Sequence, residues 1–131
     1  MIISKWIASA CVCASLAIGC GGGSGGSGVD GTLELVELEA DEVSDLCGYV
    51  IDQLGPTREI ACPDGTLTIE AQTQAECEAD FDTLPLTCTA TVSNAEACAE
   101  AIGGLSDDEL CSGDALPAAC APLFSASCSG Q

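Results

Sequence analysis

The chain of 131 residues is strongly acidic: 21 Asp and Glu stand against two Lys or Arg, there is no histidine, and the formal net charge at pH 7 is −19. A surface of this sign repels nucleic acids and anionic lipid headgroups, so we expect no nucleic-acid partner. Aromatic residues make up only 3% of the chain, so its core contributes little hydrophobic stabilisation per residue.

The N-terminus has the layout of a bacterial lipoprotein signal. One basic residue, Lys5, precedes an apolar or small run over 6–18, which suits a signal peptide and is too short for a transmembrane helix of about 20 residues. Gly19 then places a small residue before Cys20, where a peptidase can cut and the freed cysteine can carry a diacylglycerol thioether. We therefore predict a signal peptide over 1–19 and lipidation at Cys20. Ordinary secretion with cleavage nearby and no lipid is the alternative.

A tether and one small domain follow the lipidated cysteine. Residues 21–31 are mostly Gly and Ser, so we predict that 20–31 forms an anchored, flexible tether with an end-to-end distance of roughly 15–20 Å. The domain then occupies 32–131. All acidic residues follow Cys20, and Arg58 is the only later Lys or Arg. We interpret this charge as a solvated acidic surface.

The first part of the domain changes its hydrophobic period. Residues 32–40 alternate only partly, and we predict an extended lead-in there. From 41 to 54 the apolar positions recur at spacings of three and four, which predicts a helix with one apolar face, ended by Gly55-Pro56. Over 58–70 the turn sequence Pro63-Asp64-Gly65 divides two short strands and predicts a β-hairpin.

Three capping signals, in which Ser or Thr is followed three residues later by Glu, predict the later helices: Thr73 with Glu76, Ser93 with Glu96, and Ser106 with Glu109. The helices are predicted over about 73–84, from about 93 to 103, and as a single turn that reaches Cys111. Pro117 and Pro122 divide the last segment into short turns. The predicted fold is mainly α, a small disulfide-rich domain of about four short helices with one short β-hairpin.

The cysteines after Cys20 are even in number and lie within one small domain: Cys47, Cys62, Cys77, Cys88, Cys98, Cys111, Cys120 and Cys128. In an exported chain this pattern predicts four disulfides. No metal site is expected, because the chain has no histidine and no Cys-x-x-Cys pair. No cofactor is expected either.

The pairing of these cysteines stays open among several connectivities. Chain geometry favours bridges that join a helix to the segment that doubles back along it, namely Cys47–Cys62 and Cys77–Cys88. The last four cysteines are predicted to pair in sequence or nested, as Cys98–Cys111 with Cys120–Cys128, or as Cys98–Cys128 with Cys111–Cys120.

Several short motifs recur in the same order in a loose family: Asp45-Leu46-Cys47-Gly48-Tyr49, Cys62-Pro63-Asp64-Gly65, Gln74-Ala75-Glu76-Cys77, Cys88-Thr89-Ala90-Thr91-Val92, Glu96-Ala97-Cys98, and a tail with Leu116-Pro117, Cys120 and Cys128. Over residues 41 to 128 the chain resembles the small cysteine-rich lipoproteins of the myxobacterial type. That family often has an acidic residue and tryptophan where this chain has Gly48 and Tyr49. The resemblance implies an architecture and a compartment, and no activity.

No catalytic residues are expected. The absence of histidine removes Ser-His and Cys-His mechanisms, and the loss of Lys5 with the signal peptide removes a Ser-Lys mechanism. Oxidised cysteines supply no thiolate nucleophile. A carboxylate pair that hydrolyses a glycoside needs a cleft with sugar contacts, and only Tyr49, Phe81 and Phe124 remain as aromatic residues after Cys20.

We therefore expect a non-catalytic lipoprotein of the cell envelope, bound to the membrane through its N-terminal lipid and presenting an acidic domain for interaction or envelope structure. Its protein partner is not identified by the sequence. Gly21 replaces the aspartate that retains some lipoproteins at the inner membrane, which favours the outer membrane. The alternative is a disulfide-rich inhibitor or toxin-like module that presents Arg58 in an exposed loop over 54–59, whereas the simpler interpretation of Arg58 is a solubilising turn residue.

Overall fold

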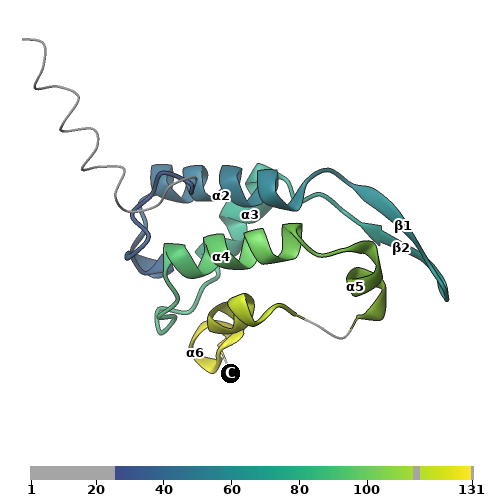
Figure 1. Ribbon diagram of the computed structural model, residues 1–131. Helices are drawn as coiled ribbons and strands as arrows, with labels where there is room; N and C mark the ends of the chain where they lie inside the picture. Colours follow the sequence, from purple (N-terminus) through teal and green to yellow (C-terminus); the bar gives the residue numbers. More distant parts are fainter. Residues whose placement is uncertain (1–25, 114–115, 131) are drawn as a thin grey trace, which may run out of the picture.

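The computed structural model of the protein describes residues 26–113 and 116–130 (Figure 1). It is mainly helical, with one two-stranded antiparallel hairpin and four disulfides. This confirms the predicted fold class. The predicted signal peptide and Cys20 lie outside the described residues.

The chain enters the domain earlier than its composition suggests. The Ser27 backbone N–H and hydroxyl both donate hydrogen bonds to Glu96 Oε1, over 2.6 and 2.7 Å, and the Ser93 N–H donates to the Gly31 carbonyl. The prediction of a flexible tether as far as residue 31 is therefore wrong for 26–31. Gly and Ser allow flexibility, but a carboxylate from a distant part of the chain holds this segment in place.

The predicted extended lead-in is only partly extended. The Leu35 N–H donates to the Ala90 carbonyl and the Val92 N–H donates to the Leu33 carbonyl, so two distant segments lie side by side here. A short 3-10 helix, η2 (Leu35–Glu37), interrupts the extended backbone. The prediction missed η2, which positions the buried Leu35 side chain in the core.

Helix α2 (Ala40–Leu54) agrees with the predicted helix over 41–54. Its first turn is capped where the Glu39 N–H donates to Glu42 Oε2 over 2.9 Å. Its apolar face buries Leu46 completely. It ends at Gly55, whose φ of 76° is readily available only to glycine.

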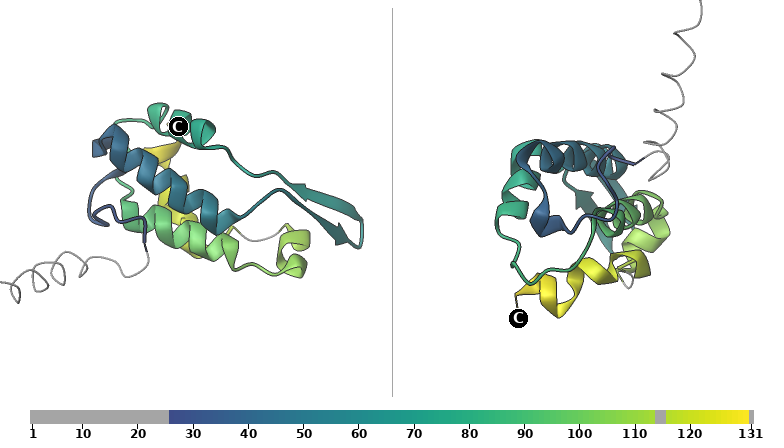
Figure 2. Two further views of the ribbon diagram at one scale, coloured as in Figure 1. Left: turned by 90° about the horizontal axis from the view of Figure 1, so that it is seen from above. Right: turned by 90° about the vertical axis from the view of Figure 1, so that its left-hand side faces the viewer.

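The hairpin follows at the far end of α2. Strand β1 (Arg58–Cys62) pairs with β2 (Gly65–Ile69) in a register that aligns Arg58 with Ile69 and Cys62 with Gly65. The predicted Pro-Asp-Gly turn is confirmed. The hairpin extends beyond the helices, beside α5 (Asp107–Ser112), as the view from above in Figure 2 shows.

Helices α3 (Gln74–Asp82) and α4 (Val92–Gly103) complete the central part of the fold. Thr73 and Glu76 cap α3 as predicted. The predicted cap of α4 at Ser93 and Glu96 is wrong. Thr91 and Asn94 form that capping box instead, because Asn94 Oδ1 accepts the Thr91 N–H over 2.9 Å. Glu96 is thereby free to bind Ser27.

The C-terminal segment forms the 3-10 helix η3 (Ala118–Phe124) and the short helix α6 (Ala126–Ser129). Helix α3 packs on α2, α2 packs on α4, and α4 packs on η3. These four elements therefore form an arc, which is seen end-on in the right-hand view of Figure 2. The core cluster of buried residues comprises Leu35, Leu46, Cys88, Ala90, Val92, Ala95 and Cys128.

All eight cysteines after Cys20 form disulfides, but none of the predicted pairs occurs. The bridges are Cys47–Cys77, Cys62–Cys111, Cys88–Cys128 and Cys98–Cys120. The prediction paired cysteines close in sequence, whereas each bridge joins two elements that pack together or a loop to the C-terminus. The hairpin projects away from α2, so Cys62 meets Cys111 of α5 and leaves Cys47 to Cys77 of α3.

Candidate functional site

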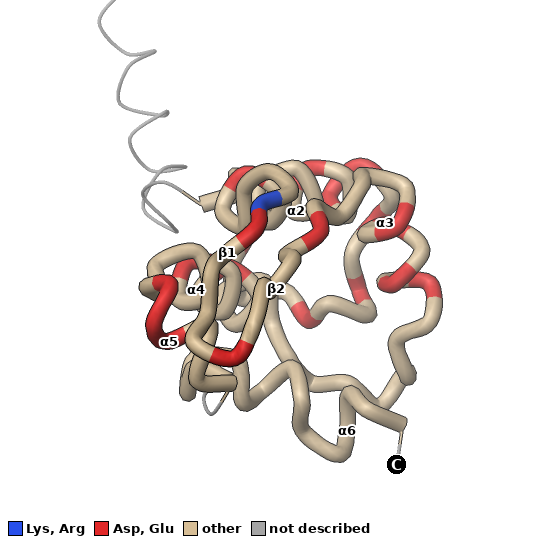
Figure 3. The backbone as a smooth tube through the Cα atoms, turned by 90° about the vertical axis from the view of Figure 1, so that its right-hand side faces the viewer, with Lys and Arg blue, Asp and Glu red and all other residues tan. Residues whose placement is uncertain are grey.

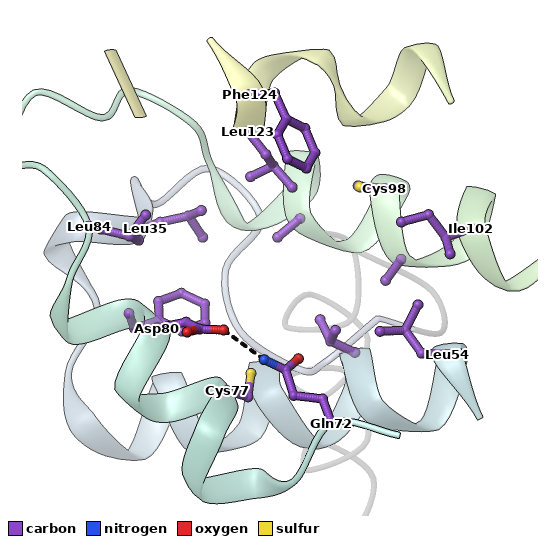
Figure 4. A pocket seen from close by; sticks show the side chains of 14 residues that line it. Leu35, Leu54, Gln72, Cys77, Asp80, Leu84, Cys98, Ile102, Leu123 and Phe124 are labelled. Atoms are coloured by element: carbon purple, nitrogen blue, oxygen red, sulfur yellow. Dashed lines mark hydrogen bonds between the residues drawn. The ribbon is translucent and has the colours of Figure 1, made fainter. Parts of the chain in front are cut away.

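A pocket of about 410 Å³ lies on the concave side of the arc, between α2, α3, α4 and η3 (Figure 4). Its lining is predominantly apolar and comprises Leu35, Val50, Leu54, Gln72, Cys77, Asp80, Phe81, Leu84, Ala95, Cys98, Ala99, Ile102, Leu123 and Phe124. The core cluster and the pocket share Leu35 and Ala95, so the pocket continues the core toward the surface.

Small side chains on α4 leave the room for this pocket. Ala95, Cys98, Ala99 and Ile102 follow the spacing of one helix face and all line the pocket. Two of these four positions are alanine. Larger residues there would bring α4 side chains into the space that the pocket occupies.

Disulfides hold the walls of the pocket in two pairs. Cys77, which lines the pocket, bonds to Cys47 and thereby joins α3 to α2. Cys98, which also lines it, bonds to Cys120 and joins α4 to η3. An apolar hollow in a flexible domain tends to collapse, because collapse removes apolar surface from water. These two bridges limit how far the walls can move together.

One edge of the pocket is polar. Gln72 Nε2 donates a hydrogen bond of 2.7 Å to Asp80 Oδ2, and Figure 4 shows this pair across the pocket from Leu123 and Phe124. In the described residues no hydrogen bond reaches the second carboxylate oxygen, Asp80 Oδ1. Asp80 is an exposed residue, so its carboxylate stands where the pocket meets solvent.

Both phenylalanines of the chain, Phe81 and Phe124, line this pocket. Phe124 is 61% exposed, a large value for an aromatic side chain in a chain with so few of them. Its exposure places an apolar ring at the mouth of the pocket, where a bound molecule would cover it.

The two long walls of the pocket differ in charge. Helix α3 carries four acidic residues, Glu76, Glu78, Asp80 and Asp82, whereas residues 116–130, which form η3 and α6, carry no charged side chain. Figure 3 shows acidic residues on α2, α3, α5 and the hairpin, and none on α6. Of these four only Asp80 lines the pocket, so the pocket has one carboxylate on its α3 side and none on its η3 side.

The predicted site residues have mixed outcomes. The eight cysteines are bridged as described, and two of the bridges contribute Cys77 and Cys98 to the pocket. Arg58 does not lie in an exposed loop over 54–59. It is half-buried as the first residue of β1, paired with Ile69, which gives the inhibitor alternative no exposed basic loop.

The pocket was not predicted from the sequence. Its only advance signal is the run of small residues at helical spacing on α4, Ala95, Cys98 and Ala99. A buried helix face has the same pattern, and only the positions of α3 and η3 decide whether the face is covered or left open.

The described residues offer neither a metal site nor a membrane-spanning helix. Between 26 and 113 and between 116 and 130, no group of three or more Cys, Asp or Glu side chains is arranged to hold a metal ion. Over the same ranges no helix has the length and apolar character needed to cross a bilayer.

No protein-family model, curated protein or solved structure matches the chain. Its function therefore has to be inferred from its own residues and geometry.

Proposed function

We propose that the protein is a non-catalytic, lipid-anchored lipoprotein of the cell envelope, of the small cysteine-rich myxobacterial type, whose acidic domain binds a small apolar molecule in the pocket between α2, α3, α4 and η3. The pocket is the observation that carries the binding function. The anchor at Cys20, the membrane partner and the preference for the outer membrane are carried by the N-terminal sequence alone.

The size and lining of the pocket support a ligand-binding function. Its volume of about 410 Å³ falls within the range of about 300–1,000 Å³ typical of small-molecule sites. Such sites combine apolar walls with a few polar groups that orient the ligand. Here the apolar walls are accompanied by one polar pair, Gln72 and Asp80.

The position of the N-terminal segment would place the pocket near a membrane, which is a source of apolar ligands. Cys20 precedes Ser27 by seven residues, and seven extended residues span at most about 25 Å. Ser27 is bound to Glu96 of α4, so a lipid on Cys20 would hold α4 within that distance of the bilayer. The pocket would then lie close to a membrane in which apolar molecules are concentrated.

Binding of a neutral apolar probe tests the function directly. We would titrate decanol by isothermal titration calorimetry into the oxidised chain from residue 20 onward, with Cys20→Ser so that no attached acyl chain can enter the pocket. Saturable binding with one site per chain is expected. Absence of saturable binding would overturn the proposed ligand-binding function.

Two alanines of α4 provide a matched pair of variants. Ala99→Leu places a larger side chain in the pocket and should weaken decanol binding, whereas Ala97→Leu makes the same change at an exposed position outside the pocket and should not. Thermal melts establish that both variants fold. If Ala99→Leu fails to fold, Phe124→Ala, at an exposed position on the rim, should weaken binding without loss of the fold. A folded pocket variant, Ala99→Leu or Phe124→Ala, that binds decanol as tightly as Ala97→Leu does would show that binding occurs elsewhere.

The anchor is tested separately by Cys20→Ser in the full precursor. The variant should be released into the soluble fraction or remain uncut, because the lipid acceptor is gone. Fractionation of membranes followed by mass measurement of the N-terminus distinguishes these results. A processed Cys20→Ser protein that stays on the membrane would contradict the lipid anchor.

A further inference from the structure

We propose that the molecule bound in this pocket is a cationic amphiphile, an apolar body with a single amine-type head, and that Asp80 binds the head. This inference rests on the proposed function and specifies its ligand class. It follows from the charge and arrangement of the groups at the two sides of the pocket.

Asp80 is arranged to receive a positively charged donor. Gln72 holds one carboxylate oxygen, Oδ2, at 2.7 Å, which restricts the rotation of the carboxylate. Among the described residues the other oxygen, Oδ1, accepts no hydrogen bond. An ammonium group at the pocket mouth would donate to Oδ1, and a hydrogen bond between two charged groups is stronger than one between neutral groups.

Phe81 adds a second attraction for a cation, and Phe124 offers a surface for the methylene chain. Phe81 follows Asp80 in α3 and lines the same pocket, and Phe124 lines the opposite wall. The face of an aromatic ring attracts a cation within about 6 Å of its centre, and a methylene chain also packs well on it. Both parts of an alkylammonium ion therefore find complementary groups here.

The apolar part of the proposed ligand fits the uncharged side of the pocket. Leu123 and Phe124 belong to the uncharged segment 116–130, and Ala99 and Ile102 of α4 continue this surface into the pocket. A ligand oriented with its head at Asp80 and its tail toward η3 keeps its charge at the exposed, acidic edge. Its apolar part is then covered by apolar side chains.

An anionic amphiphile is disfavoured by the same residues. Arg58 is the only Lys or Arg that follows Lys5, and it does not line the pocket. A carboxylate or phosphate head would thus meet Asp80, the one charged residue of the lining, with no basic side chain to bind it. Like-charge repulsion at this edge distinguishes fatty amines from fatty acids.

Three probes with the same alkyl chain test the assignment: decylammonium, decanol and decanoate, each kept below the concentration at which it forms micelles. We expect decylammonium to bind at least about fivefold more tightly than decanol at low salt, and decanoate to bind more weakly than decanol. The preference for decylammonium should shrink as salt is raised, because salt screens an exposed ion pair.

Asp80→Asn keeps the shape of the side chain and removes its charge, and it should reduce the decylammonium affinity to that of decanol. Asp108→Asn removes one charge from α5, outside the pocket, and should keep the preference nearly intact. Decanol affinity should be unchanged in both variants, which shows that the pocket itself is preserved.

The outcomes separate the ligand class from the binding function. If decanol binds but decylammonium binds no more tightly, the cationic ligand is overturned and the apolar pocket stands. If the preference survives Asp80→Asn, or is lost equally in Asp108→Asn, the role of Asp80 is overturned. If none of the three probes binds, both the proposed ligand-binding function of the pocket and the proposed cationic ligand are overturned.

Discussion

Two glycines show how strongly the effect of one methyl group depends on its surroundings. Gly48 lies within α2, and a Cβ added there would meet nothing within 4 Å. Gly103 lies at the end of α4, where an added Cβ would overlap the Gln53 carbonyl oxygen of α2. The two helices can therefore pack closely at Gly103 only because that residue has no side chain.

We predict that Gly48→Ala stabilises the domain by about 0.5–1 kcal/mol, because alanine loses less conformational freedom in a helix. Gly103→Ala should destabilise it by about 1–3 kcal/mol, because the new methyl group forces the helices apart. Urea unfolding of the oxidised proteins measures both changes. Equal effects of the two substitutions would show that helix propensity alone decides, and that the contact at Gly103 is not close.

The single tyrosine is the second informative residue. Burial and a hydrogen bond to Glu100 raise the pKa of Tyr49 to about 12, from its ordinary value of 10.0. We predict that Glu100→Gln lowers the Tyr49 pKa without restoring 10.0, because burial, the larger cause, remains. Ultraviolet titration reads this one residue directly, since the chain has no other tyrosine. A Tyr49 that titrates near 10.0 in the unaltered protein would contradict this environment.

At the scale of elements, the capping boxes make helix stability depend on pH. The backbone N–H and then the hydroxyl of Ser106 donate to Glu109, which lowers the pKa of that carboxyl below its ordinary 4.5. A depressed carboxyl pKa contributes stability above the unfolded value, and this contribution is lost as the pH falls through the folded value. Thr73 and Glu76 do the same for α3.

We predict that Glu109→Gln removes this pH dependence, because the amide oxygen still caps the helix but does not titrate in this range. The difference in melting temperature between the original protein and the variant should be constant above pH 4.5 and shrink on further acidification. Asp108→Asn, one residue earlier and outside the capping box, serves as the control. A difference that grows in acid would show that repulsion between carboxylates outweighs the cap.

A second prediction at this scale concerns the hairpin. Strands β1 and β2 contact the rest of the domain mainly through α5, and a two-stranded hairpin alone is marginally stable. Replacement of Cys62 and Cys111 by alanine should therefore abolish amide-exchange protection in the hairpin and leave α2 and α4 protected. Replacement of Cys88 and Cys128, which join the core cluster, should instead lower protection everywhere, by about 2–4 kcal/mol.

Short sequence motifs predicted most helices and the hairpin correctly. They gave wrong predictions where a residue far away in the chain binds one of the motif's side chains. Thr73 with Glu76 and the Pro63-Asp64-Gly65 turn act through neighbours in the chain, and both were predicted. The identical spacing of Ser93 and Glu96 predicts a cap that does not form, because Glu96 binds Ser27 from a distant segment. Spacing alone does not show which of two adjacent caps a helix uses.

The sequence could not predict which cysteines pair, and it could not predict the pocket, for a related reason. Both depend on which helix faces which, and the apolar stripes of α2, α3 and α4 permit more than one arrangement. Ala95 and Ala99 are equally suited to close contact with a neighbouring helix. Their exposure to a pocket follows from where Cys98–Cys120 holds η3.

At the scale of the whole molecule, covalent bridges stabilise a core that is small and rich in alanine and cysteine. Four bridges at about 2–4 kcal/mol each approach the total stability of a typical small domain. We predict that full reduction abolishes the helical far-UV circular dichroism and the cooperative melt, and does so most completely at low salt, where carboxylate repulsion is strongest. Helical signal that persists unchanged after reduction would show that side-chain packing alone carries the fold.

The connectivity of the bridges has a consequence for biosynthesis. No cysteine is bonded to the cysteine next to it along the chain, and Cys62–Cys111 crosses each of the other three bridges. A chain that is oxidised while it emerges from a translocation channel offers Cys47 and Cys62 to each other before Cys77 has appeared. Any bridge made then is non-native and must be exchanged through a free thiolate. The native domain thus requires oxidation to wait until the helices have assembled, or a disulfide isomerase to correct the early products.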